Sequence, residues 1–261
     1  MRIALPGLLL AILAALGPRP AVAADPFDEL LYRGLLSRHT RAVEDTAGTR
    51  VDYRGLRGST DWQRLLRNLA QARPEDLRGQ SEHLAFWINA YNVLAIDVVL
   101  QHYPVASIRD AGGLFTPVWK IDAGSVGGRI RTLHEIEHEI LRPMGEPRIH
   151  AAIVCASTSC PSLAREPYTA AQLDAQLDAS LASFLADPRK GLAVDWPGGP
   201  LRLSKIFDWF EKDFAAQGGV RKFITPHAPA RERAWLAGPG KSARIRSLGY
   251  DWSLNDLGDG R

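Results

Sequence analysis

The sequence contains 261 residues, of which 32 are Lys or Arg and 29 are Asp or Glu, so its formal net charge is only +3. This near balance argues against a nucleic-acid-binding protein, which would carry a strongly basic stripe. The chain is long enough for one large domain with a hydrophobic core, and we expect residues 24–261 to form that domain.

The N-terminal segment has the pattern of a cleaved export signal. Arg2 precedes an apolar stretch from Leu8 to Leu16, and Ala21-Val22-Ala23 offers small residues for cleavage. No other segment approaches the roughly 18 uncharged apolar residues that a membrane-spanning helix needs. The sequence therefore predicts a signal peptide at residues 1–23 and a mature protein without a transmembrane segment, located in the periplasm or secreted.

Helices dominate the first hundred residues. Apolar spacing predicts one helix within 27–43 and another at 62–72, which ends before Pro74. Residues 84–100 are apolar almost all round, so we expect a helix that is buried inside the domain. Asn89 and Asn92 lie three residues apart on one face of this helix. A buried amide without partners costs about 1–3 kcal/mol, so these side chains either tie loops to the core or line a site.

Strands and further helices follow. An apolar run at 149–154 predicts a buried strand, and Thr169 with Gln172 fits a capping box at the start of a helix over 170–186. The other predicted elements are strands at 115–122 and 128–131, a helix from Thr132, a hairpin of 192–195 with 201–203, and a helix at 205–214 capped by Ser204. We therefore expect an α+β fold, a helix-rich single domain around a small, mostly antiparallel sheet.

The segment His134-Glu135-Ile136-Glu137-His138 matches the H-E-x-x-H pattern of zinc proteases, in which two histidines four residues apart bind the metal. However, Thr132 and Glu135 also fit a capping box, and no third ligand follows at a recognised spacing. We therefore predict neither a metal nor another cofactor. Glu137 falls within the buried stripe of this helix, where a carboxylate must be paired or must orient a site.

The two cysteines, Cys155 and Cys160, lie five residues apart in a loop of small residues. In an exported protein they could form a disulfide, worth roughly 2–3 kcal/mol, or remain reactive thiols. A nucleophilic cysteine needs thiolate character, a base and a group that orients the base. His138 and His150 are the candidate bases. An extended strand would hold His150 about 16 Å from Cys155, which favours His138.

Five segments in this order resemble the domain-of-unknown-function 547 (DUF547) family. They are Phe86–Asn92, Ile136–His138, Cys155–Pro161, Leu203–Phe210 and Tyr250–Asn255, and the resemblance runs from about residue 80 to residue 255. It implies an exported bacterial protein with an α/β-type fold, and it brings no activity with it. A papain- or transglutaminase-like arrangement is suggested by residue types alone. In papain-like enzymes the cysteine starts a helix, whereas Cys155 here is predicted to leave a strand.

We therefore expect a thiol-dependent protein that acts on a peptide-like or thiol-bearing small molecule by acyl transfer, hydrolysis or thiol exchange. In this hypothesis Cys155 or Cys160 is the nucleophile, His138 is the base and Glu137 orients it. The expected substrate-binding residues are Trp87, Asn89, Asn92, His150 and Ser157. Two alternatives remain: a non-catalytic peptide-binding or assembly module with a structural Cys155–Cys160 disulfide, and a zinc metallohydrolase that uses His134 and His138.

Overall fold

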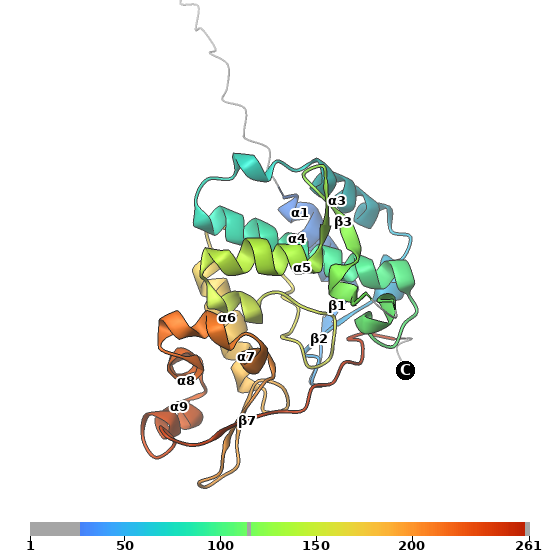
Figure 1. Cartoon of the computed structure of the whole chain (residues 1–261). Helices are drawn as coiled ribbons and strands as arrows, with labels where there is room; N and C mark the ends of the chain where they lie inside the picture. The colour runs from blue at the N-terminus through green and yellow to red at the C-terminus, as the bar shows by residue number, and fades with distance from the viewer. Residues whose placement is uncertain (1–26, 114–115, 259–261) are drawn as a thin grey trace, which may run out of the picture.

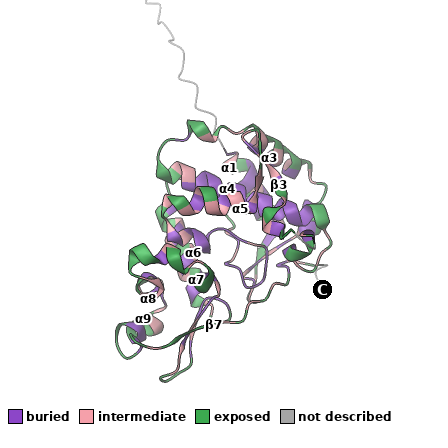
Figure 2. Cartoon of the chain, in the orientation of Figure 1, coloured by how far each residue is buried: buried purple, intermediate pink, exposed green. Residues whose placement is uncertain are grey.

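Helix α4 (Gln80–His102) passes through the interior of the molecule (Figure 1). The computed structural model describes residues 27–113 and 116–258, so the export signal predicted at residues 1–23 lies outside the described residues. Every residue of α4 from Leu84 to Leu100 is buried, as its apolar character predicts (Figure 2). The helix is long and apolar enough to cross a membrane, but 94% of its most apolar window is buried inside the protein, as in a core helix.

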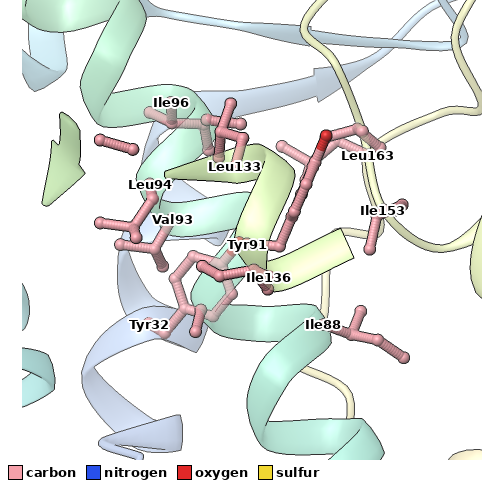
Figure 3. Close-up of a cluster of buried hydrophobic side chains, with 14 of the residues drawn as sticks. Tyr32, Ile88, Tyr91, Val93, Leu94, Ile96, Leu133, Ile136, Ile153 and Leu163 are labelled. Atoms are coloured by element: carbon pink, nitrogen blue, oxygen red, sulfur yellow. The ribbon is translucent and has the colours of Figure 1, made fainter. Parts of the chain in front are cut away.

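Helix α4 lies at the centre of the first of two hydrophobic cores in the described residues, and the other elements up to residue 141 are grouped with it. They are α1 (Glu29–His39), β1 (Thr40–Ala42), β2 (Thr49–Val51), α2 (Tyr53–Leu56), α3 (Thr60–Gln71), η1 (Pro74–Asp76), η2 (Ile108–Ala111), η3 (Val118–Lys120), β3 (Asp122–Val126), β4 (Arg129–Thr132), α5 (Leu133–Glu135) and η4 (Ile136–Leu141). Figure 3 shows Leu133 and Ile136, from α5 and η4, beside side chains of α4.

The second core is built by the C-terminal half of the chain. The elements that follow η4 are η5 (Arg142–Met144), η6 (Pro147–Ala151), α6 (Leu173–Ala186), β5 (Leu192–Val194), β6 (Leu201–Leu203), α7 (Ile206–Trp209), η7 (Glu211–Gln217), α8 (Val220–Ile224), η8 (Thr225–His227), α9 (Ala230–Ala237) and β7 (Ile245–Ser247). Of these, η5 and η6 also contribute Met144 and Ile149 to the first core. Helix α6 joins the two cores, because Leu173 and Leu177 belong to the first and Leu181 and Phe184 to the second.

The fold is α+β, as predicted, with many helices and three small sheets in the part of the chain that the structure describes. The pairs β1–β2, β3–β4 and β5–β6 are antiparallel, and β7 adds to β6 in parallel. The predicted hairpin at 192–195 and 201–203 is confirmed as β5–β6. The capping box of Thr132 and Glu135 is confirmed as well, since both of its hydrogen bonds are present.

The predicted strand at 149–154 is wrong. Residues Pro147–Ala151 form a 3-10 helix instead, because Pro147 occupies its first turn and the Glu146 side chain accepts from the backbone N–H of Arg148. A run of four apolar residues does not distinguish a buried strand from a buried helical turn. As a result, His150 and Cys155 are not held apart by an extended segment, and both line the same cavity.

Two other predicted elements begin at different residues. The strand placed at 115–122 begins only at Asp122, after the 3-10 turn Val118–Lys120. The helix placed at 170–186 begins at Leu173, because the side chain of Gln176 bonds to the backbone of Thr169 and Pro167 and fixes the preceding turn.

The buried amide of Asn92 generates a stability prediction. Asn92→Ala leaves the carbonyl of Ala152 and the N–H of Val154 without partners, so we expect the free energy of unfolding to fall by about 2–4 kcal/mol in urea titrations. The matched control is Gln80→Ala on the same helix, which removes an exposed hydrogen bond and should cost less than about 1 kcal/mol. Equal losses in the two variants would contradict this role of Asn92.

Candidate functional site

A cavity of about 330 Å³ lies where the two cores meet, and both cysteines line it. Besides the two thiols and Tyr250, its ionisable side chains come from α4 and from residues 134–150: Tyr91, His134, Glu137, His138 and His150. Its aromatic wall comes from both halves and consists of Trp119, Trp209, Phe210, Tyr250 and Trp252. The cavity therefore combines reactive groups with a mostly apolar binding surface, as small-molecule and peptide sites usually do.

Helix α4 fixes the start of the thiol loop, which we define as residues 152–161. The Asn92 carbonyl oxygen accepts from the N–H of Val154 at 2.9 Å, and its amide donates to the carbonyl of Ala152 at 3.0 Å. Directly after Cys155, Ala156 adopts a φ of 57°. Non-glycine residues rarely occupy this left-handed region, and such strain is concentrated at functional sites.

The C-terminal segment and Lys190 fix the rest of the thiol loop. The N–H of Asn255 donates to the carbonyl of Ala156 at 2.9 Å, and the N–H of Thr158 donates to the carbonyl of Ser253 at 2.8 Å. The buried Lys190 ammonium donates to the carbonyl of Cys160 at 2.9 Å. The loop is therefore held at both ends by the folded protein, so the positions of its two sulfur atoms are well defined.

The two thiols are in direct contact but have different surroundings. Both cysteines are free, and their Sγ atoms lie 2.6 Å apart, so a disulfide bond of about 2.0 Å needs only a small movement. Cys155 is partly exposed to the cavity, whereas Cys160 is buried and its sulfur accepts from the backbone N–H of Cys155 at 2.9 Å. An incoming molecule therefore meets Cys155 first.

Hydrogen bonding makes the acidities of the thiols unequal. Burial alone would raise the pKa of Cys155, but hydrogen bonds with Cys160, Ser157 and Tyr250 lower that pKa below its ordinary value. The pKa of Cys160 is raised by burial and by the negative charge of its neighbour. Since the thiolate is the nucleophilic form, Cys155 is the attacking sulfur and Cys160 remains a thiol beside it.

Glu137 is the acid–base group that is electrostatically coupled to this pair. Burial first, and the neighbouring Cys155 second, raise the pKa of Glu137 to about 7, and its carboxylate is hydrogen-bonded to Tyr91. It lies in the π-helical turn η4, a distortion that is frequent at functional sites. At neutral pH the carboxyl is about half protonated, so it can both donate and accept a proton.

A second network holds the two predicted bases. Asp213 accepts two hydrogen bonds from Arg142 and one from Nε2 of His150, at 2.6–2.8 Å. Arg142 also donates to Nδ1 of His138. Burial and the neighbouring His134 lower the pKa of His138 to about 4, so its imidazole is neutral at physiological pH. His138 is therefore bound to an arginine, while Cys155 has other hydrogen-bond partners.

Aromatic rings form the outer wall of the cavity. Trp209 packs against Tyr250 with ring centroids 4.9 Å apart, and Tyr250 packs against Trp252 at 4.5 Å. Trp119 lies 6.2 Å from Trp252, and the guanidinium of Arg109 lies over the Trp252 ring at 5.1 Å. Such a surface favours apolar or peptide-like groups next to the thiols.

The structure brings most of the predicted site residues together. Cys155, Cys160, Glu137, His138 and His150 all line the cavity, and the hydroxyl of Ser157 lies 3.1 Å from the Cys155 sulfur.

The other predicted substrate-binding residues lie elsewhere. The Asn89 amide is occupied by the backbone of Tyr168, and Trp87 packs under Arg131. Asn92 acts on the thiol loop from behind, through backbone bonds.

The predicted H-E-x-x-H segment is part of the cavity wall. The rings of His134 and His138 lie with their centroids 4.2 Å apart, while the Glu135 carboxylate accepts from the backbone N–H of Thr132 in the capping box. Within residues 27–113 and 116–258, no group of three or more His, Cys, Asp or Glu side chains is arranged to hold a metal ion.

Sequence reasoning missed Asp213, Arg142 and Tyr91. Asp213 is one of several acidic residues in a helical segment, and no sequence pattern distinguishes it from its neighbours. Tyr250 was within reach of sequence reasoning, because it begins the last of the five segments that resemble DUF547. Its contact with Cys155, 95 residues away, requires the folded structure.

The comparisons with known proteins identify a family. Residues 74–185 match the family described as "Protein of unknown function, DUF547", which supports the resemblance that the sequence shows. The matched segment contains α4, Glu137, His138 and both cysteines, whereas Asp213 and Tyr250 lie beyond it. No curated protein and no solved structure matches the chain, so a papain- or transglutaminase-like arrangement stays a prediction.

The hydrogen bond from Tyr250 generates a prediction about thiol reactivity. Tyr250→Phe keeps the aromatic wall but removes a donor to the Cys155 thiolate, so alkylation of Cys155 by iodoacetamide at pH 7 should slow about five-fold. The pH profile of alkylation should move to higher pH. Tyr168→Phe, which loses a bond to Ser180, is the control. Unchanged alkylation in Tyr250→Phe would show that this phenol does not stabilise the thiolate.

The raised pKa of Glu137 predicts a pH dependence of stability. Between pH 4.5 and 7 the folded protein keeps a proton on Glu137 that the unfolded chain releases, so this group stabilises the fold less as pH rises. Relative to Glu137→Gln, the wild type should therefore lose on the order of 3 kcal/mol of unfolding free energy across this range. The exposed neighbour Glu139→Gln is the control and should follow the wild type. Parallel profiles for wild type and Glu137→Gln would contradict the assignment.

Proposed function

We propose that this protein is an exported enzyme of thiol–disulfide exchange, which acts on a peptide-like or thiol-bearing substrate. Cys155 attacks the substrate and Cys160 resolves the mixed disulfide. The observation that carries the proposal is the contact of two unequal thiols, 2.6 Å apart, in the wall of one cavity. The proposal of export rests on the N-terminal pattern of Arg2, the apolar stretch and Ala21-Val22-Ala23.

The first exchange step uses Cys155. Its thiolate attacks one sulfur of a substrate disulfide R–S–S–R′, so that a Cys155–S–S–R bond forms and the S–S bond of the substrate breaks. The leaving R′–S⁻ takes a proton from protonated Glu137. Tyr250, whose pKa is raised well above its ordinary value by burial and by both cysteines, remains a protonated donor throughout.

The second step uses Cys160. Its thiol gives its proton to the Glu137 carboxylate, and the new thiolate attacks Sγ of Cys155. A Cys155–Cys160 disulfide forms and R–S⁻ leaves. The substrate disulfide is then reduced by two electrons and the protein dithiol is oxidised by two, while Glu137 is protonated again. The same steps in reverse let the oxidised protein form a disulfide in a dithiol substrate.

The surroundings of the histidines favour exchange over acyl transfer or hydrolysis. Those reactions require one thiol with a base at hydrogen-bond distance. Here Nδ1 of His138 accepts from Arg142, Nε2 of His150 is bonded to Asp213, and the Cys155 sulfur contacts Cys160, Ser157 and Tyr250. Of the three reactions, only exchange uses a second thiol in contact with the first.

Trapping the mixed disulfide tests the proposal. In Cys160→Ser the resolving sulfur is absent, so incubation with cystine should leave one cysteine attached to Cys155 in nearly every chain, measured by intact mass and peptide mapping. The wild type should instead form the internal disulfide and retain no adduct. Cys155→Ser should react at least about a hundred-fold more slowly, since the remaining thiol is buried and its pKa is raised.

Two results would contradict the proposal. One is equal adduct formation on Cys155→Ser and Cys160→Ser, which would deny Cys155 its role as the attacking thiol. The other is a Cys155–Cys160 bond in the native protein that resists reduction by millimolar dithiothreitol unless the protein is unfolded. That result would favour the binding or assembly module with a structural disulfide.

A further inference from the structure

Strand β7 leaves one edge of the three-stranded sheet unpaired. Strand β7 pairs with β6 in parallel. The carbonyl of Arg244 accepts from the N–H of Leu201, and the N–H of Leu248 donates to the carbonyl of Leu203. Between these two bonds, the parallel register directs the backbone groups of Arg246 toward β6. The backbone groups of Ile245 and Ser247 therefore point away from β6, and they have no hydrogen-bond partner in the part of the chain that the structure describes. All three residues of β7 are exposed, and Ile245 retains 44% of its surface.

This free edge leads directly to the thiols. Two residues separate Ser247 from Tyr250, whose hydroxyl lies 3.3 Å from the Cys155 sulfur. At about 3.3 Å per residue, a strand that pairs with β7 reaches the cavity after about three further residues. Beyond Tyr250 the C-terminal segment is bonded to the thiol loop, through Asp251 and Ser159.

The charges near the edge indicate what kind of strand it accepts. Residues 238–249 contain Lys241, Arg244 and Arg246 and no acidic residue. The neighbouring Arg202 on β6 is paired with Asp195 at 2.7 Å, and this one carboxylate also interacts with Arg246. A second copy of this chain would place arginine against arginine along the edge, which is unfavourable, whereas an acidic segment would complement it.

From this edge we infer the substrate class of the proposed exchange reaction: an extended, acidic polypeptide segment that contains a cysteine and adds a strand to β7. The inference rests on the proposed function. Backbone hydrogen bonds to Ile245 and Ser247 supply affinity that depends little on sequence, as in other cases of strand addition. The aromatic wall then receives the residues next to the reacting cysteine. The enzyme would thus act on unfolded or exposed chain segments.

The experiment compares two activated disulfides with the same leaving group, 5-thio-2-nitrobenzoate. One is a ten-residue acidic peptide with a single cysteine, and the other is N-acetylcysteine. The reduced wild type should react with the peptide about ten-fold faster or more, since the edge supplies several hydrogen bonds. Two further peptides are N-methylated, one at the odd and one at the even backbone nitrogens. Only the peptide whose methylated nitrogens face β7 should lose this advantage in rate, and this comparison leaves the protein itself unchanged.

Variants of Ser247 locate the effect on the protein. Ser247→Pro removes an N–H that faces the free edge, a place where proline is tolerated in strands, whereas Ser247→Ala keeps it. The ratio of the peptide rate to the N-acetylcysteine rate should fall about ten-fold in Ser247→Pro and should not fall in Ser247→Ala. A basic peptide of the same length should react more slowly than the acidic one, and added salt should reduce the difference.

The outcomes separate this inference from the proposed function. If neither compound reacts with Cys155, the exchange function itself is wrong. If both react but N-methylation and Ser247→Pro leave their ratio unchanged, exchange stands and the edge is not the substrate site. A dimer in light scattering that Ser247→Pro converts to a monomer would show that a second copy occupies the edge, which overturns the inference.

Discussion

Every face of α4 is buried from Leu84 to Leu100, and the rest of the first core is arranged to cover it. A helix without a solvated side cannot rely on water for its polar groups, so each of them needs a protein partner. Asp97 accepts from the Trp62 indole at 2.9 Å, and Asn89 bonds to the backbone of Tyr168. Asn92 does the same for the start of the thiol loop, so the burial of this helix also fixes the position of Cys155.

The chemistry of the site follows from what surrounds each group at the boundary between the two cores. The first core supplies Glu137 and both thiols, and the C-terminal half supplies Tyr250 and Asp213. Charges buried at such a boundary interact more strongly than they do in water. This interaction makes the pKa values of the Cys155 and Cys160 thiols unequal, although the two groups are chemically identical. The Cys155 thiolate has hydrogen-bond partners and access to the cavity, whereas Cys160 is buried and lies beside the negative charge of Cys155.

Part of this arrangement is predictable from the sequence. The all-apolar stretch at 84–100 indicates the core helix, the two clusters of strand-forming residues indicate the hairpin, and the cysteine spacing indicates a thiol site. The local conformation of 149–154 is not predictable, because four apolar residues suit a 3-10 turn as well as a strand. The partners of Cys155 and His150 are also beyond sequence reasoning, since Tyr250 and Asp213 come from segments 95 and 63 residues away. Such contacts depend on how α6 joins the two cores, and a single sequence carries no periodic signal for that.

In the proposed function, Cys155 and Cys160 act together as one two-electron redox pair, and equilibration with glutathione buffers of stepped potential distinguishes a pair from two independent thiols. The samples are quenched with acid and alkylated, and the redox state of each cysteine is read by mass spectrometry. Both thiols should disappear together along one reversible curve with the slope of a two-electron couple, as the internal disulfide replaces them. Stable glutathione adducts on Cys155, with Cys160 still a free thiol at every potential, would contradict it.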